Sequence, residues 1–259
     1  RDDCWNWSEN LWEGPSLEAR LNGKKPYVIA FVGAGGKTSL IRRLAWEGRA
    51  RGRKVLVATT THMFRPAAYG VLSQRAEDVA FQLEQKGLAV AGRASGEEKI
   101  AYVGDELYGQ ICPLADLVLV EADGSKRLPV KVPRPGEPVV PENGDMVLAV
   151  LGISSLGKPA EEKCFRLEQA CRLMDKCGRK DYRKDGRWIL KPEDLACLMR
   201  NGYLNPLRLD RPELSVLPVF NQADGENSRL LARKLLEQMG ETEGIVSGEL
   251  KEDPSCGLF

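Results

Sequence analysis

A buried-strand pattern that runs directly into a glycine-rich turn constrains this chain more than any other feature. The apolar run Tyr27–Val32 leads into Gly33-Ala34-Gly35-Gly36, and Lys37-Thr38-Ser39 follows at once. Apolar residues then recur at helical spacing, at Leu40, Ile41, Leu44 and Ala45. A strand, a glycine turn and a helix in this order favour phosphate binding, because unhindered amides and the positive end of the helix dipole attract an anion.

Each part of the turn has an expected role. Lys37 would supply a point charge, and the Thr38 hydroxyl would hold Mg²⁺. The turn is shorter than the Walker A pattern, since two residues rather than four separate its outer glycines. The ATP-dependent Mur-type peptide ligases have a similar short loop, so its length is compatible with a triphosphate. We therefore predict that the nucleotide is bound by Gly33, Ala34, Gly35, Gly36, Lys37, Thr38 and Ser39.

The composition is that of an ordinary soluble globular chain. Its 259 residues are 42% hydrophobic and 29% charged, which allows one large core or two modest ones. The net charge is +1 without a basic block, so we expect no nucleic acid and no membrane as partners. The start of the chain has no apolar signal segment, and its seven cysteines form no Cys-x-x-Cys pair, so we expect a cytoplasmic protein.

Short β-branched runs alternate with amphipathic stretches, which indicates βαβ units. We predict an α/β fold with a doubly wound, mostly parallel sheet, arranged as a three-layer sandwich like that of P-loop NTPases. The predicted strands are Val28–Val32, Val55–Thr59, Leu117–Glu121, Met146–Leu151, Val216–Phe220 and Gly244–Ser247. The predicted helices are Thr38–Glu47, Ala76–Gln85, Pro159–Met174, Pro192–Met199 and Ser228–Gln238.

Most of the chain is expected to form one domain. The predicted parts are an N-terminal aromatic arm at 1–25, a single P-loop α/β domain at 26–259, a small hairpin insertion near 88–103 and a helical and loop excursion near 160–212. The arm holds Trp5, Trp7 and Trp12. Such a density of aromatic residues rarely stays solvated, so we expect these side chains to pack on their own domain, with docking of a partner as the alternative.

A second apolar strand, predicted at Leu117–Glu121, ends in carboxylates. This is typical of a central parallel strand whose carboxyl end opens into an active site. We interpret the segment as a Walker B strand and assign the metal to Asp123. The role of Glu121 stays open between metal ligation and the orientation or deprotonation of a nucleophile.

Basic residues follow these acids closely. Lys126 and Arg127 are near enough to reach a γ-phosphate or an anionic substrate, and solvated surface charge is the alternative for both. Lys131 is interpreted as surface charge. The predicted catalytic residues are Lys37, Glu121, Asp123 and Arg127, and Lys126 is assigned to nucleotide binding.

The strand predicted at Val55–Thr59 also ends in polar residues. Hydroxyls of Thr59 and Thr60 would coordinate Mg²⁺ or bind phosphate, although threonines also suit a strand by propensity alone. His62 is the single histidine, and we interpret it as structural, because no second histidine exists to complete a transition-metal site; a general base or metal ligand is the alternative.

A late strand is followed by Asn221-Gln222-Ala223-Asp224, where guanine-specific GTPases have Asn-Lys-x-Asp. Gln222 replaces the lysine whose stem packs on the base. Two interpretations of Asn221 and Asp224 stay open, which are contact with the base of the nucleotide and an Asx turn before the last helix.

Seven segments together carry a family resemblance: Val32–Ser39, Ala58–Thr61, Val120–Pro129, Glu137–Pro141, Leu151–Ile153, Leu156–Pro159 and Asn221–Asp224. In them the chain resembles the YqeC-type accessory proteins of selenium-dependent molybdenum hydroxylases, also described as selenium cofactor biosynthesis proteins. The resemblance implies a nucleotide-dependent role in maturing such an enzyme or its cofactor. Three positions depart from the family pattern, namely Gly136 and Phe165, where histidines are common, and Gln222, where lysine is usual.

The sequence thus predicts a P-loop accessory protein that binds Mg²⁺ with ATP or GTP and hydrolyses the nucleotide slowly. A molybdenum hydroxylase client or a cofactor intermediate would be its partner, as the resemblance implies. An ATP-dependent ligase or kinase for a small anionic substrate is one alternative, because the short loop is Mur-like. A nucleotide-regulated binding module or chaperone without catalysis is the other.

Overall fold

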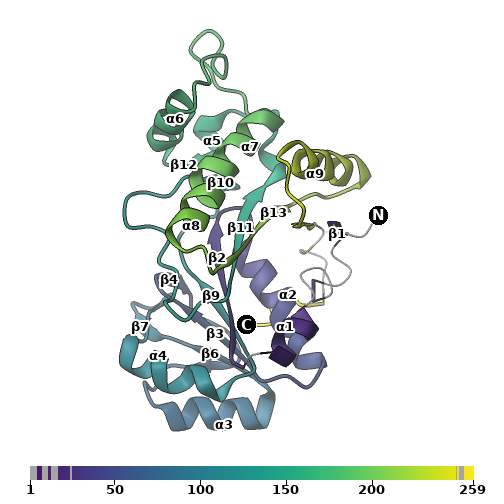
Figure 1. The fold of residues 1–259 in the computed structure, drawn as a ribbon. Helices are drawn as coiled ribbons and strands as arrows, with labels where there is room; N and C mark the ends of the chain where they lie inside the picture. Colours follow the sequence, from purple (N-terminus) through teal and green to yellow (C-terminus); the bar gives the residue numbers. More distant parts are fainter. Residues whose placement is uncertain (1–4, 8–10, 13–16, 24, 249, 251–253) are drawn as a thin grey trace.

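A computed structural model describes residues 1–259 except 1–4, 8–10, 13–16, 24, 249 and 251–253, and only the backbone of 5–7. Helices cover both faces of one large sheet (Figure 1). The helices are α1 (Leu17–Gly23), α2 (Lys37–Ala50), α3 (Ala76–Lys86), α4 (Asp105–Ile111), α5 (Ala160–Lys163), α6 (Leu167–Lys176), α7 (Pro192–Met199), α8 (Asn205–Asp210) and α9 (Glu226–Gln238). The strands of the large sheet are β1 (Trp5–Trp7), β2 (Tyr27–Gly33), β3 (Val55–Thr59), β5 (Gly70–Val71), β6 (Leu88–Ala91), β9 (Leu117–Glu121), β11 (Met146–Gly152), β13 (Ser215–Asn221) and β14 (Gly244–Val246).

The large sheet is parallel at every pairing between its described strands. Their order is β1-β14-β13-β11-β2-β9-β3-β6-β5. From β2 the chain runs towards β3 and β6, returns through β9, and then continues on the other side of β2 with β11 and β13 (Figure 1). This reversal is the topological switch point at which open α/β sheets bind their ligands. The predicted α/β, doubly wound and mostly parallel fold is confirmed.

Alternate residues of β2 explain the three layers. All seven residues of this strand are buried. Ile29 and Phe31 pack in a core cluster with α1 and α2. Ala30 and Val32 face the opposite side, in a cluster that includes α7 and α9, and Val28 joins the cluster of α3 and α4. A strand covered on both faces is apolar throughout, which is why the sequence pattern was continuous rather than alternating.

The predicted strands agree with the observed ones to within a residue or so at each end. One helix prediction was wrong. The single helix expected at Pro159–Met174 is divided into α5 and α6 by the short strand β12 (Cys164–Phe165) and by Arg166, whose φ is +67°. β12 pairs in parallel with β10 (Val130–Lys131), so long-range pairing overrides the helical pattern here.

A small antiparallel sheet lies beside the large one. It consists of β4 (His62–Phe64), β8 (Lys99–Ala101) and β7 (Arg93–Ser95) in that order. The hairpin predicted near 88–103 therefore comprises β7 and β8, while β6 belongs to the large sheet.

Part of the N-terminal arm packs on the domain. Trp12 is 2% exposed, and the backbone amides of Leu11 and Trp12 donate to the buried carboxylate of Glu47 at 3.0 and 2.7 Å. The side chains of Trp5 and Trp7 lie outside what the structure describes. None of the helices in the described ranges is long and apolar enough to cross a lipid bilayer.

Candidate functional site

Glycines shape the turn between β2 and α2. Gly33, Gly35 and Gly36 have φ values of +91°, +85° and +105°, a region that side chains with a Cβ rarely adopt. A Cβ on Gly36 would lie 2.5 Å from Nδ2 of Asn221, and one on Gly35 would lie 2.3 Å from the backbone N of Gly152. The turn is thus packed against the ends of β13 and β11, and glycine is required there.

The backbone amides of the glycine turn were expected to bind phosphate, but three of them have acceptors within the protein. The N–H groups of Gly33, Ala34 and Gly35 donate within the protein, to Asp123 Oδ2 at 2.9 Å, to the Val150 carbonyl at 2.8 Å and to the Leu128 carbonyl at 3.1 Å. These hydrogen bonds stabilise the turn, and the three amides do not point at an open anion site. The first turn of α2, which no side chain caps, presents the amides that have no acceptor within the helix.

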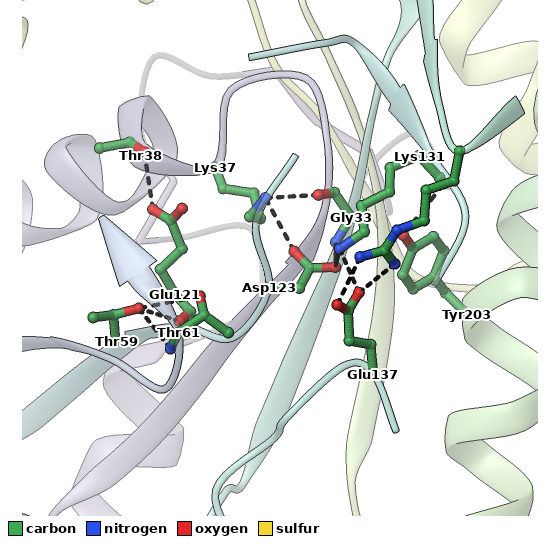
Figure 2. A network of polar contacts seen from close by, with 11 residues as sticks. Gly33, Lys37, Thr38, Thr59, Thr61, Glu121, Asp123, Lys131, Glu137 and Tyr203 are labelled. Carbon is green, nitrogen blue, oxygen red and sulfur yellow. Dashed lines mark hydrogen bonds and ion pairs between the residues drawn. The ribbon is translucent and has the colours of Figure 1, made fainter. Parts of the chain in front are cut away.

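Lys37 begins α2 and turns back over the loop. Its side chain is 2% exposed, and Nζ donates to the Gly33 carbonyl at 2.6 Å and pairs with Asp123 Oδ1 at 3.1 Å (Figure 2). The structure therefore brings the predicted phosphate lysine to the predicted Walker B segment. Lys37 is held by protein acceptors in this state.

Thr38 faces Glu121 rather than Asp123. Its hydroxyl donates to Glu121 Oε2 at 2.9 Å, joining the first turn of α2 to the end of β9 (Figure 2). Burial raises the pKa of Glu121, and the neighbouring Lys37 and Thr38 oppose this shift. A hydroxyl and a carboxylate side by side are oxygen ligands of the kind that Mg²⁺ prefers.

Asp123 is fully buried, and a lysine ammonium pairs with each of its carboxylate oxygens. Besides Lys37, it pairs through Oδ2 with Lys131 Nζ at 2.9 Å, and it accepts the Gly33 amide. The metal assigned to Asp123 from the sequence would therefore have to compete with two lysines. Glu121, by contrast, forms no ion pair with a lysine among the described residues and accepts the Thr38 hydroxyl.

The interpretation of Lys131 as surface charge was wrong. Its side chain is 0% exposed, and Nζ also pairs with Glu137 Oε2 at 2.9 Å. Glu137 accepts two hydrogen bonds from the guanidinium of Arg166, at 2.6 and 2.7 Å. Burial raises the pKa of Glu137, but the hydrogen bonds from Arg166 and the charge of Lys131 outweigh it and lower the pKa to about 2.

Lys131, Glu137 and Arg166 were missed as members of the site. The available signal was the Val130-Lys131-Val132 run, because a lysine flanked by valines in a short strand is a candidate for a buried charge. Both valines are buried. The hydroxyl of Tyr203 donates to the Lys131 carbonyl at 3.2 Å (Figure 2).

The threonines at the end of β3 and in the loop that follows are hydrogen-bonded to the backbone. The Thr59 hydroxyl donates to the Glu121 carbonyl at 2.9 Å and accepts the amide of Thr61 at 3.1 Å. The Thr60 hydroxyl donates to the Val139 carbonyl at 2.8 Å. These contacts fix the loop beside Glu121, so both predicted residues lie at the site while their hydroxyls are already engaged.

Lys126 and Arg127 lie exposed on the loop after Asp123. Lys126 Nζ lies 5.0 Å from the ring centroid of Phe165, and the guanidinium carbon of Arg127 lies 4.3 Å from that of Phe64. Neither cation forms an ion pair with a carboxylate in the described part of the chain. Their charges are thus available at the edge of the site.

The two predicted residues at the end of β13 and after it, Asn221 and Asp224, have different surroundings. Asn221 is buried and donates from Nδ2 to the Gly35 carbonyl at 2.7 Å, so it supports the glycine turn. Asp224 is exposed and lies beside Gly248, where a Cβ would be 3.0 Å from its Oδ1. Ser39, in the first turn of α2, is partly buried.

Two solved structures resemble the chain weakly. They are the signal recognition particle receptor FtsY from Elizabethkingia anophelis, in one structure in complex with GDP, with 18% identity in both cases. The TM-scores are 0.31 and 0.30, with 91% and 93% of this chain and 52% and 58% of those chains covered. Similarity at this level carries no argument about the present site.

The sequence comparisons are more specific. The protein YqeC of Escherichia coli strain K12, whose name describes it as uncharacterized, is 37% identical in an alignment of 160 residues, and the match covers 56% of this chain and 60% of that protein. The chain thus spans less than two thirds of the relative it matches. The model of the YqeC protein family matches residues 29–168, a range that contains Lys37, Glu121 and Lys131. Since this match includes more than half of its residues, the chain belongs to the YqeC protein family.

Proposed function

We propose that this chain binds a nucleoside triphosphate with Mg²⁺ at the first turn of α2 and hydrolyses it slowly. The observation that carries the proposal is the arrangement of Lys37, Thr38 and Glu121. It places a buried ammonium, uncapped helix amides and a hydroxyl–carboxylate pair at the carboxyl ends of neighbouring parallel strands. These are the groups that a triphosphate with its metal requires.

Each group has a defined part in this proposal. The amides of the first turn of α2 and the Lys37 ammonium bind the terminal phosphates. Thr38 and Glu121 would hold Mg²⁺, which when bound would neutralise charge on the phosphates. Catalysis would then rest on positioning and on stabilising the charge that develops on the transferred phosphoryl group.

The exposed cations favour a second candidate function. Lys126 and Arg127 lie on the loop that directly follows Asp123 and have no carboxylate partner among the described residues. They suit a small anionic second substrate, so a ligase or kinase is the alternative. Such an enzyme would turn over nucleotide only when that substrate is present.

Calorimetric titration with ATP and GTP, each with Mg²⁺, tests nucleotide binding. Saturable binding followed by slow release of phosphate supports a hydrolase. Binding with no turnover supports a nucleotide-regulated module, and turnover that depends on an added anionic metabolite supports the ligase or kinase. A strong preference for GTP would support contact of Asp224 with the base.

The biological part of the proposal rests on the family. We propose that nucleotide hydrolysis by this chain serves the maturation of a selenium-dependent molybdenum hydroxylase or its cofactor. Cells that lack the protein should then yield hydroxylase with reduced activity and reduced selenium content. The wild-type chain should restore both, and the Lys37→Met variant should not. Unchanged hydroxylase in the deleted strain would contradict this role.

A further inference from the structure

Asp123 is shared by two buried lysines. One carboxylate oxygen pairs with Lys37 Nζ at 3.1 Å, and the other pairs with Lys131 Nζ at 2.9 Å (Figure 2). The side chains of the three residues are 0 to 2% exposed. Because water is excluded, these charges depend on one another for compensation.

The proposed function requires Lys37 to leave this arrangement. Its ammonium is held by Asp123 and by the Gly33 carbonyl at 2.6 Å, whereas a bound triphosphate would draw it towards the phosphates. A buried carboxylate that loses its sole counter-charge is strongly destabilised. Lys37 is therefore free to move only if Asp123 keeps another cation.

Lys131 is built to be that cation. It lies in β10, and the carbonyl of the same residue accepts a hydrogen bond from Tyr203 at 3.2 Å. Glu137 also pairs with the ammonium, at 2.9 Å, and Arg166 holds Glu137 through two hydrogen bonds. Lys131 is thus anchored by contacts that a nucleotide at α2 would leave in place.

We propose that Lys131 is a positioning residue of the nucleotide site. It supplies the counter-charge of Asp123 and keeps that carboxylate on the Gly33 amide. The side-chain ammonium of Lys37 can then move from Asp123 to the phosphates of a bound triphosphate. Asp123 then regulates Lys37 and is not itself a ligand of the nucleotide or its metal. The inference rests on the proposed function, since it concerns the same site.

Two substitutions at this cluster have opposite expected effects. Lys131→Met removes the second cation, so Asp123 retains Lys37 and nucleotide affinity falls about tenfold or more. Asp123→Asn removes the competing charge while its side-chain oxygen still accepts the Gly33 amide, so affinity stays within about threefold of the wild type. The double variant should bind like Asp123→Asn, because without the Asp123 carboxylate Lys131 no longer affects how tightly Lys37 is held.

The experiment is a calorimetric titration of the full chain with Mg²⁺ and non-hydrolysable analogues of ATP and GTP. Lys86→Met, at an exposed position at the end of α3, is the matched control and should bind like the wild type. A merely structural role of Lys131 would lower the fraction of binding-competent protein, which appears in the stoichiometry, while the dissociation constant of the folded molecules would not change.

Three results would overturn the inference: an unchanged dissociation constant in Lys131→Met, a double variant as weak as Lys131→Met, or a loss in Asp123→Asn as large as in Lys37→Met. The last result would mean that Asp123 serves the nucleotide or its metal directly, and it decides the matter even if Lys131→Met does not fold. Absence of binding by the wild-type chain contradicts the proposed function and removes the inference with it.

Discussion

The hydroxyl of Thr38 donates to Oε2 of Glu121 at 2.9 Å, although the two residues are 83 positions apart in the chain. Thr38 belongs to the first turn of α2, and Glu121 is the last residue of β9. β9 and β2 are adjacent parallel strands, so their carboxyl ends meet at one edge of the sheet. The contact therefore joins the helix that follows the glycine turn to the acidic strand, which is the basis for the metal site proposed above.

Loss of the Lys37 ammonium should reduce turnover by about 100-fold, comparable with the removal of one preorganised donor. Lys37→Ala and Lys37→Met remove the charge, and Met keeps most of the side-chain volume. Steady-state release of phosphate measures the effect, with Lys86→Met as the control. Unchanged turnover in both Lys37 variants would exclude this lysine from the mechanism.

Substitution at the Thr38–Glu121 pair should raise the Mg²⁺ concentration needed for nucleotide binding by about tenfold or more. Thr38→Val removes one proposed oxygen ligand, and Glu121→Gln replaces the charged carboxylate with a neutral amide, which is a weaker ligand of Mg²⁺. Their effects should not add in the double variant, because both act on one metal. Thr242→Val, at an exposed position, is the matched control. Unaltered Mg²⁺ dependence in both single variants would place the metal elsewhere.

Glu137 should contribute to stability in a pH-dependent manner. Its pKa in the folded state is about 2, below the ordinary 4.5, so the folded state binds fewer protons than the unfolded state between these values. The contribution is complete above about pH 4.5 and is lost as the pH falls towards 2. Glu137→Gln should lower the free energy of unfolding at pH 7 by about 3 kcal/mol, because it leaves the partly buried Arg166 without its carboxylate and the buried Lys131 with Asp123 alone.

Urea unfolding of the wild type and of Glu137→Gln between pH 7 and pH 3 measures this difference, which should shrink towards the acidic end. Glu97→Gln, at an exposed position between β7 and β8, serves as the control. A difference that is independent of pH would contradict the ion-pair account of Glu137.

The Gly36→Ala variant should be destabilised by about 2 kcal/mol or more, because φ is +105° and the new Cβ would lie 2.5 Å from Asn221 Nδ2. Gly23→Ala is the matched control, since open space surrounds that position. Thermal unfolding compares the two. Equal stability of both variants would show that the glycine turn is not packed on Asn221 as described.

Much of the fold was predictable because its signals are local. Strands such as β3 and β9 are buried on both faces, so their positions appear as continuous apolar runs with polar residues at the carboxyl end. The division between α5 and α6 was not predictable in this way. It depends on the pairing of Cys164 with Val130 and on the left-handed backbone of Arg166, which are long-range constraints.

The residues of the candidate site were likewise predictable where the signal is local and not where it depends on long-range contacts. Lys37 and Thr38 were identified from a motif whose residues are adjacent in the chain. The choice between Glu121 and Asp123 as the partner of Thr38 depends on strand register, which one sequence does not contain. Lys131 resembles a surface lysine by type, and its burial depends on Glu137 and Asp123, whose proximity arises only in the folded chain.

The most direct test of the account is a crystal structure of this chain with Mg²⁺ and a non-hydrolysable nucleoside triphosphate. The account predicts terminal phosphates on the amides of the first turn of α2, with Lys37 Nζ on a phosphate oxygen and the metal beside Thr38 and Glu121. Lys131 should still pair with Asp123. A triphosphate bound elsewhere on the molecule, with Lys37 still on Asp123, would contradict it.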